Sequence, residues 1–133
     1  MKGLDEFNTR TEALDHIVRE KDVTRKQAEK ILNQSIPKES YYQTKILKYL
    51  KAKYPKAFIW KAAAGPYSYC GIPDVCMVLD GIFYGFEVKR PFIGRPSQMQ
   101  LRTIRLIRGA GGIAGIVTSV KDVEEMIREG VTK

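Results

Sequence analysis

Apolar residues recur at the spacing of one helix face in the segment that begins at Glu39. Tyr42, Ile46 and Leu50 follow one another at i, i+4 and i+8, so residues 39–54 are predicted to form an amphipathic helix. Helical steps back from Leu50 return to Glu39, which places a carboxylate in the first turn of the same face. This carboxylate either only interacts favourably with the helix dipole or also points inward at a site, and the pattern leaves both possibilities open.

Shorter apolar runs after this helix predict strands that alternate with two further helices. The predicted strands are 57–61, 75–79, 82–89 and 112–118, and the predicted helices are 97–108 and 119–129. Two short helices, 11–21 and 25–36, precede them, with Thr24 as the N-cap of the second. This order predicts an α/β fold in which helices flank a mixed central sheet. We expect residues 1–38 to be a helical extension and residues 39–133 to be the main domain.

Polar residues and glycines indicate where the predicted helices start and stop. Ser97 is expected to cap the helix that runs to residue 108, and Gly109 is expected to end it. Ser119 and Asp122 have the spacing of a capping box at the start of the last helix. The early helical pair fits either a helix-turn-helix nucleic-acid reader or a packing or dimerisation element.

The two middle strands are joined by Asp80-Gly81, a dipeptide typical of a two-residue type I′ hairpin turn. Continuing the pairing from this turn places Asp74 directly opposite Glu87 on one face of the hairpin. Lys89 shares that face because side chains alternate along a strand, and Gly85 is expected to leave open space beside the pair. The other face is apolar and suits a core. A one-residue bulge would shift the register and separate the two carboxylates.

Two carboxylates this close are costly unless a proton or a cation lies between them. Oxygen ligands suit a hard divalent ion, Mg²⁺ or Mn²⁺, which takes one or two protein carboxylates and keeps several waters. Lys89 beside such an ion could hold, or help to deprotonate, an attacking water. The alternative is a structural ion cluster of Asp74, Lys89 and Glu87 at a strand end, and the spacing leaves both interpretations open.

Three short segments together resemble the PD-(D/E)xK nuclease superfamily. They are Gly71-Ile72-Pro73-Asp74, Phe86-Glu87-Val88-Lys89-Arg90 and Ser97-Gln98-Met99-Gln100. More narrowly, the chain resembles the stand-alone VRR-NUC (virus-type replication-repair nuclease) domain common in phages, over residues 39–127. The resemblance implies a restriction-endonuclease-like core and a metal-dependent DNA endonuclease that leaves a 5′-phosphate and a 3′-hydroxyl. It also implies selectivity for DNA structures such as junctions or flaps, in replication, repair or recombination.

The resemblance assigns roles to individual residues. The implied catalytic residues are Glu39, Asp74, Glu87, Lys89 and Gln100, and the implied metal ligands are Asp74, Glu87 and the main-chain carbonyl of Val88. Lys89 would handle the nucleophilic water, and Glu39 would complete the acidic site through metal or water. Gln100 would orient the site from its helix, with Gln98 as a rival for that role. The implied cofactor is Mg²⁺ or Mn²⁺, with no organic cofactor.

The charge balance suits a polyanionic partner. The chain carries 23 Lys and Arg against 15 Asp and Glu, a formal net charge of +8, and the excess is concentrated in residues 39–118. Phosphate binding by such a segment would release counterions, while a purely solubilising surface would explain the same charge. The predicted phosphate contacts are Lys61, Arg90, Arg95, Arg102 and Arg105. Tyr67 and Tyr69 could stack on bases or pack over the sheet.

Several other classes of protein are not favoured. The first seven residues lack the apolar run of a signal peptide, so we expect a cytoplasmic protein of a bacterial or phage-infected cell, with no membrane partner. Cys70 and Cys76 match no disulfide framework or common zinc pattern and are expected to be buried thiols. DNA is the expected partner, and a homodimer is compatible with related resolvase-like enzymes that pair two subunits. The alternatives are a non-catalytic nucleic-acid-binding module with this fold and a basic adaptor that recruits proteins through residues 11–36.

Overall fold

The computed structural model describes residues 3–63 and 71–132. Tyr67, Tyr69 and Cys70 lie outside these ranges. Contacts divide the chain into two compact units, one of the residues before Glu39 together with Arg90–Gly94, and one of Glu39–Lys89 and the residues from Arg95 onward. No helix in the described ranges is long and apolar enough to cross a membrane.

The N-terminal unit is a helical hairpin. Its elements are η1 (Leu4–Glu6), α1 (Arg10–Lys21) and α2 (Arg25–Ser35). Thr24 caps α2 as predicted, and Gln27 completes a capping box with it. The buried residues Leu14, Ile17 and Leu32 form the apolar contact between the two helices. Arg90 belongs to this unit, because its guanidinium donates hydrogen bonds to carbonyl oxygens at the C-terminal end of α2.

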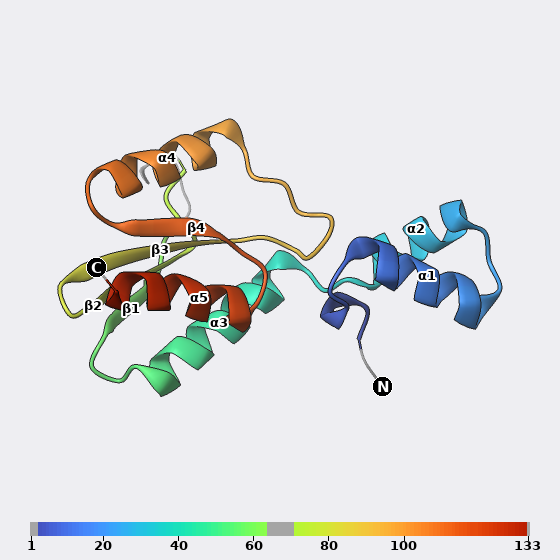
Figure 1. The fold of residues 1–133 in the computed structure, drawn as a ribbon, viewed down its shortest axis with the longest axis horizontal. Helices are drawn as coiled ribbons and strands as arrows, with labels where there is room; N and C mark the ends of the chain where they lie inside the picture. Colours follow the sequence, from blue (N-terminus) through green and yellow to red (C-terminus); the bar gives the residue numbers. More distant parts are fainter. Residues whose placement is uncertain (1–2, 64–70, 133) are drawn as a thin grey trace. The chain divides into compact units, whose positions relative to one another are not determined.

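The second unit is a mixed four-stranded sheet with helices on both faces (Figure 1). Its elements are α3 (Glu39–Lys53), β1 (Phe58–Lys61), β2 (Val75–Leu79), β3 (Ile82–Val88), α4 (Gln98–Gly109), β4 (Ile113–Val117) and α5 (Val120–Val131). The strand order is β1-β2-β3-β4, antiparallel except for the β3–β4 pair, which is parallel and connected through α4. The predicted order of elements and the mixed sheet are confirmed.

The hairpin register is the one that the turn dipeptide predicts. Asp80 and Gly81 both have positive φ angles, 52° and 82°, as a type I′ turn requires. Leu79 pairs with Ile82, and the register continues without a bulge to the pair of Val75 with Phe86. Asp74 and Glu87 are therefore the next opposed positions.

The two faces of the sheet are covered by different helices (Figure 1). One face carries the buried residues Val75, Met77, Tyr84, Phe86 and Val88 and packs under α3 and α5. Gly130 of α5 lies so close to Tyr84 that an added Cβ would collide with the tyrosine hydroxyl. The other face carries Glu87 and lies under α4, whose Gln100 donates a hydrogen bond to it. Alternation along β3 thus separates an apolar core from a polar site.

Three details of the helix ends differ from the sequence predictions. Gly109 is the last residue of α4 rather than its terminator, and the positive φ of 95° falls at Gly111. Asp122 does not close a capping box, because its carboxylate accepts from the amide and hydroxyl of Thr118 instead of from the N-cap amide. The last helix continues to Val131, two residues beyond the predicted end, because the buried Gly130 packs against β3.

Candidate functional site

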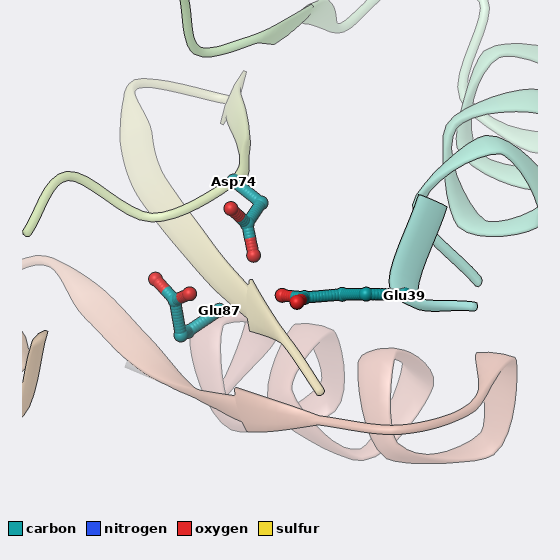
Figure 2. A group of neighbouring side chains, drawn as sticks. All are labelled: Glu39, Asp74 and Glu87. Carbon is teal, nitrogen blue, oxygen red and sulfur yellow. The ribbon is translucent and has the colours of Figure 1, made fainter. Parts of the chain in front are cut away.

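Three carboxylates converge at one end of the β2–β3 hairpin (Figure 2). Glu39 extends from the start of α3, Asp74 precedes β2, and Glu87 lies near the end of β3. One carboxylate oxygen of each lies within 4.8 Å of the others. The helical spacing left open whether Glu39 only favours the helix dipole or points inward, and the structure brings its carboxylate together with the predicted pair.

Helix α3 is fixed on the sheet by both apolar and polar contacts. Ile46 and Leu50 are buried on its inner face, as the helical spacing predicts. At the C-terminal end, the hydroxyls of Tyr49 and Tyr54 and the ammonium of Lys53 bind the carboxylate of Glu124 on α5. Burial raises the pKa of Glu124, but these three hydrogen bonds outweigh it, so the net shift is downward. The helix that carries Glu39 is thus anchored at its far end.

Backbone groups of two strands hold Asp74 in place. Its Oδ2 accepts a hydrogen bond of 2.9 Å from the amide of Val88, and its own carbonyl accepts from the amide of Ala62. Gly85 does not leave open space beside the site, as the sequence suggested. The ring of Pro73 fills that space, and a Cβ on Gly85 would approach the proline Cγ to 2.8 Å.

The glycine of the Gly71-Ile72-Pro73-Asp74 segment lets the chain approach α4. Gly71 has a φ of 83°, and a Cβ there would meet the carbonyl of Met99 and the hydroxyl of Thr103 at 2.7 Å. A larger residue would push the loop away from the helix, and both the backbone conformation and the space favour glycine. Gly71 and Pro73 thus fix the loop that delivers Asp74 to the site.

Glu87 is the most buried member of the site, with 1% of its surface exposed. Its Oε1 accepts a hydrogen bond of 2.8 Å from Gln100, whereas its Oε2 has no hydrogen-bond partner among the described residues. Burial, and then the neighbouring Asp74, raise the pKa of Glu87 to about 8, and Lys89 only partly offsets them. Without a cation, this carboxyl therefore holds a proton at neutral pH.

Lys89 lies between two acids that come from different elements, Glu39 of α3 and Glu87 of β3. Its Nζ is 3.6 Å from Glu39 Oε1 and 3.6 Å from Glu87 Oε1, and its side chain is almost buried. Its amide donates to the carbonyl of Val117 on β4, which extends the parallel pairing by one residue beyond β3. The ammonium is therefore held at the edge of the acidic cluster.

Gln100, rather than Gln98, contacts the acids. Its side-chain Oε1 accepts from the amide of Ser97 in a capping box, and its Nε2 donates to Glu87. The cap thereby fixes which end of the amide faces the site. The resemblance implied this role for Gln100 with Gln98 as a rival, and the Ser-x-x-Gln spacing of the capping box is the signal in the sequence that distinguishes the two.

Cys76 is a free, buried cysteine next to the site, as predicted. Its thiol donates to the carbonyl of Pro73 at 3.5 Å. Burial, together with the charges of Asp74 and Glu87, raises the pKa of Cys76 to about 11. The group is a neutral thiol at physiological pH and belongs to the packing beneath the carboxylates.

Comparison with known proteins places this geometry in a family. No family model matches the sequence, and no curated protein is significantly similar to it. The structure matches a solved structure described as a VRR_NUC domain, with a TM-score of 0.52 and 27% sequence identity, over 65% of this chain and 95% of that one. The chain contains a VRR-NUC domain. The resemblance drawn from the three segments and the restriction-endonuclease-like fold are both confirmed.

The VRR-NUC domain has a donor set that fits a divalent cation. Glu39, Asp74 and Glu87 offer carboxylate oxygens around one point, and Glu87 Oε2 is a buried acceptor for which no described residue supplies a donor. Such an orphaned acceptor costs free energy unless a proton or a cation satisfies it. Oxygen-only ligands favour Mg²⁺ or Mn²⁺ over softer metals. The family to which the domain belongs is a nuclease family, and a metal site suits that chemistry.

The basic residues of the VRR-NUC domain separate into two groups. Lys61, Arg95, Arg102 and Arg105 have exposed side chains, as a phosphate contact requires. Arg90 instead donates three hydrogen bonds to the carbonyls of Asn33, Ile36 and Pro37 in the N-terminal unit. These bonds use most of one guanidinium, so we do not retain Arg90 among the phosphate contacts.

Proposed function

We propose that this protein is a divalent-metal-dependent nuclease that hydrolyses phosphodiester bonds in DNA. The observation that carries the proposal is the convergence of three carboxylates, an ammonium and an amide at one end of the hairpin. A module that only bound nucleic acid would gain nothing from three acids beside phosphates, because they would repel the ligand. The acids therefore argue against the non-catalytic alternative.

Asp74 and Glu87 are the residues that would hold the metal, and Glu39 is close enough to complete the site through metal or water. The amide of Val88 faces Asp74, and N–H and C=O of one residue in an extended strand point to the same side, so the Val88 carbonyl is a fourth candidate ligand. Mg²⁺ or Mn²⁺ bound here would acidify water and neutralise charge on the scissile phosphate. Gln100 keeps Glu87 Oε1 oriented, which leaves Oε2 for the metal.

Lys89 is the candidate for positioning the attacking water. Its Nζ is held between Glu39 and Glu87, with hydrogen-bonding capacity beyond these two ion pairs. In hydrolysis, the water oxygen forms a bond to phosphorus as the P–O3′ bond breaks, and the departing O3′ takes a proton from solvent water. We propose that Lys89 orients this water and that Glu39 accepts its proton.

The preferred substrate is a DNA structure rather than a sequence. The exposed cations Lys61, Arg95, Arg102 and Arg105 suit phosphates, which fix the position of DNA without distinguishing bases. Together with the resemblance to the VRR-NUC family, this leads us to propose selectivity for branched DNA such as junctions or flaps. The N-terminal residues 1–38 are proposed to be a separate helical extension, and residues 39–133 the nuclease domain.

The function is tested by incubating the protein with junction, flap and linear duplex DNA in Mg²⁺, Mn²⁺ or EDTA. We expect cleavage in either metal and none in EDTA. Asp74→Asn and Lys89→Ala should each reduce cleavage by at least about 100-fold, the scale expected when a group acting in the transition state is removed. Gel shifts in EDTA should show that both variants still bind DNA.

Glu125→Gln is the matched control, since it removes one exposed carboxylate on α5 away from the cluster. It should cleave at the rate of the unmodified protein. Cleavage that continues in EDTA, or that Asp74→Asn leaves intact, would show that the acidic cluster is not the nuclease site. Binding without cleavage in every metal would favour the non-catalytic module.

A further inference from the structure

We propose that Phe58 and Trp60 of β1 form a stacking platform for an unpaired nucleobase of the DNA, next to the acidic cluster. The proposal rests on the proposed function, because it takes DNA as the ligand and names which part of it the protein recognises. Neither aromatic residue belongs to the site described above. Both lie on an edge strand of the sheet.

The strand register places this pair on the face of the sheet that carries the acids. Trp60 pairs with Cys76 and Phe58 with Val78. Cys76 lies two residues after Asp74, and side chains two residues apart point to the same face. Trp60 therefore lies on the same face as Asp74 and Glu87, displaced from that opposed pair by two residues, or about 7 Å, along the strand direction.

Both rings are exposed to solvent at the edge of the sheet, whereas aromatic rings that belong to a core are buried. Phe58 is 68% exposed, and Trp60 is partly exposed. The two ring centroids are 5.1 Å apart, and Trp60 is in turn 6.2 Å from Phe83 of β3. Phe83 lies beside the indole on the side toward the centre of the sheet, so the exposed pair continues into a third aromatic ring.

Nucleobases suit this surface in chemistry and in position. Aromatic side chains stack on the π-face of any base, and that face becomes available when the base is unpaired. A DNA strand whose phosphate lies at the acids would carry its neighbouring nucleotides along the row of Trp60 and Phe58.

Charge favours DNA over a second copy of the chain as the occupant of this face. The net charge of +8 makes two copies repel one another and attracts a polyanion. Phe58 and Trp60 together provide exposed aromatic surface, which single-strand binding grooves use to stack bases.

Trp60 is the only tryptophan of the chain, so its fluorescence reports this site directly. The experiment titrates the protein in EDTA with a single-stranded oligonucleotide, a flap and a blunt duplex of equal length, and follows tryptophan emission together with DNA anisotropy. We expect the single strand and the flap to quench the emission strongly and the duplex to quench it weakly. Neither metal nor cleavage is required, so this outcome is independent of the nuclease activity.

Phe58→Ala is the variant of choice, because the exposed ring can be removed with little effect on folding. It should weaken binding to the single strand and the flap by about fivefold and leave duplex binding unchanged. Val131→Ala is the matched control, an equally exposed apolar residue on α5, which covers the opposite face of the sheet. It should change neither affinity.

Three results would overturn the proposal. They are single-strand binding without a change in Trp60 emission, an equal loss of affinity for duplex and unpaired DNA in Phe58→Ala, and conversion of a dimer to a monomer by that substitution. The last would identify the face as an interface between copies. Quenching by unpaired DNA in a protein that fails to cleave in Mg²⁺ or Mn²⁺ would support the platform and contradict only the proposed nuclease activity.

Discussion

Glu87 shows how a single residue reports on the chemistry of its surroundings. Its carboxyl is buried, receives one hydrogen bond from Gln100 and leaves Oε2 without a donor from any described residue. A residue selected for stability alone would not remain an acid in this position, since burial of a charge is costly. A cation bound at Glu87 Oε2 would offset part of this cost.

Glu87→Gln should abolish a pH dependence of stability between pH 4.5 and 8, measured by urea unfolding in EDTA. The folded-state pKa of Glu87 is raised from 4.5 to about 8, so across this window the folded protein retains a proton that the unfolded chain releases. The free energy of unfolding should therefore fall as the pH rises, by up to about 5 kcal/mol. In Glu87→Gln this fall should vanish. An unchanged slope in the variant would mean that another group titrates in this range.

The elements around the site are arranged so that each acid comes from a differently constrained backbone. Asp74 is carried by a loop that Gly71 ties to α4, Glu87 by the central strand β3, and Glu39 by the start of α3. The capping box of α4 positions Gln100 above Glu87. Pro73 fits over Gly85, which locks the loop onto the hairpin.

Gly85→Ala should destabilise the protein and weaken its metal site together. The new Cβ would approach Pro73 Cγ to 2.8 Å, so the loop must move, at a cost of about 1–3 kcal/mol. Because Asp74 follows Pro73 directly, Mn²⁺ affinity measured by calorimetry should fall as well. Gly109→Ala is the control, because an added Cβ there meets nothing within 4 Å and the residue is helical. That variant should leave affinity unchanged and stability equal or slightly higher.

Considered as a whole, the molecule combines a VRR-NUC domain with a helical unit that draws on Arg90–Gly94. The matched VRR_NUC structure covers 65% of this chain, so the chain has residues beyond that domain. Arg90 follows Lys89 directly, yet its guanidinium binds the carbonyl end of α2. The net charge of +8 belongs to the chain as a whole and attracts polyanions over a distance.

Metal binding should stabilise the whole fold through linkage, because the three carboxylates converge only in the folded chain. Mn²⁺ at ten times its dissociation constant should add about 1.4 kcal/mol to the free energy of unfolding. This corresponds to a rise of about 5 °C in Tm for a domain of this size, measured by calorimetry at pH 7. Asp74→Asn should remove most of the rise, whereas Glu125→Gln should keep it. A rise that is equal in both variants would place the bound metal elsewhere.

The sequence alone determined the parts of this protein that depend on local spacing. Helical and strand periods specified the order of elements, and Asp80-Gly81 specified a turn whose register opposes Asp74 to Glu87. These follow from residues close in the chain, because a two-residue turn leaves the pairing no freedom. The helical arc likewise placed Glu39 on the inner face of its helix, although nothing in that arc showed where the face would lie.

Only the tertiary structure decided what each of these groups meets. The contact between Glu39 and Lys89 joins residues fifty positions apart. The proline ring that covers Gly85 comes from the loop before β2. The guanidinium of Arg90 binds a carbonyl at the C-terminal end of α2 instead of solvent. Such contacts depend on how whole elements pack, and spacing along the chain does not encode the distance between their surfaces. The orphaned oxygen of Glu87 arises in the same way, since burial is a property of the assembled fold.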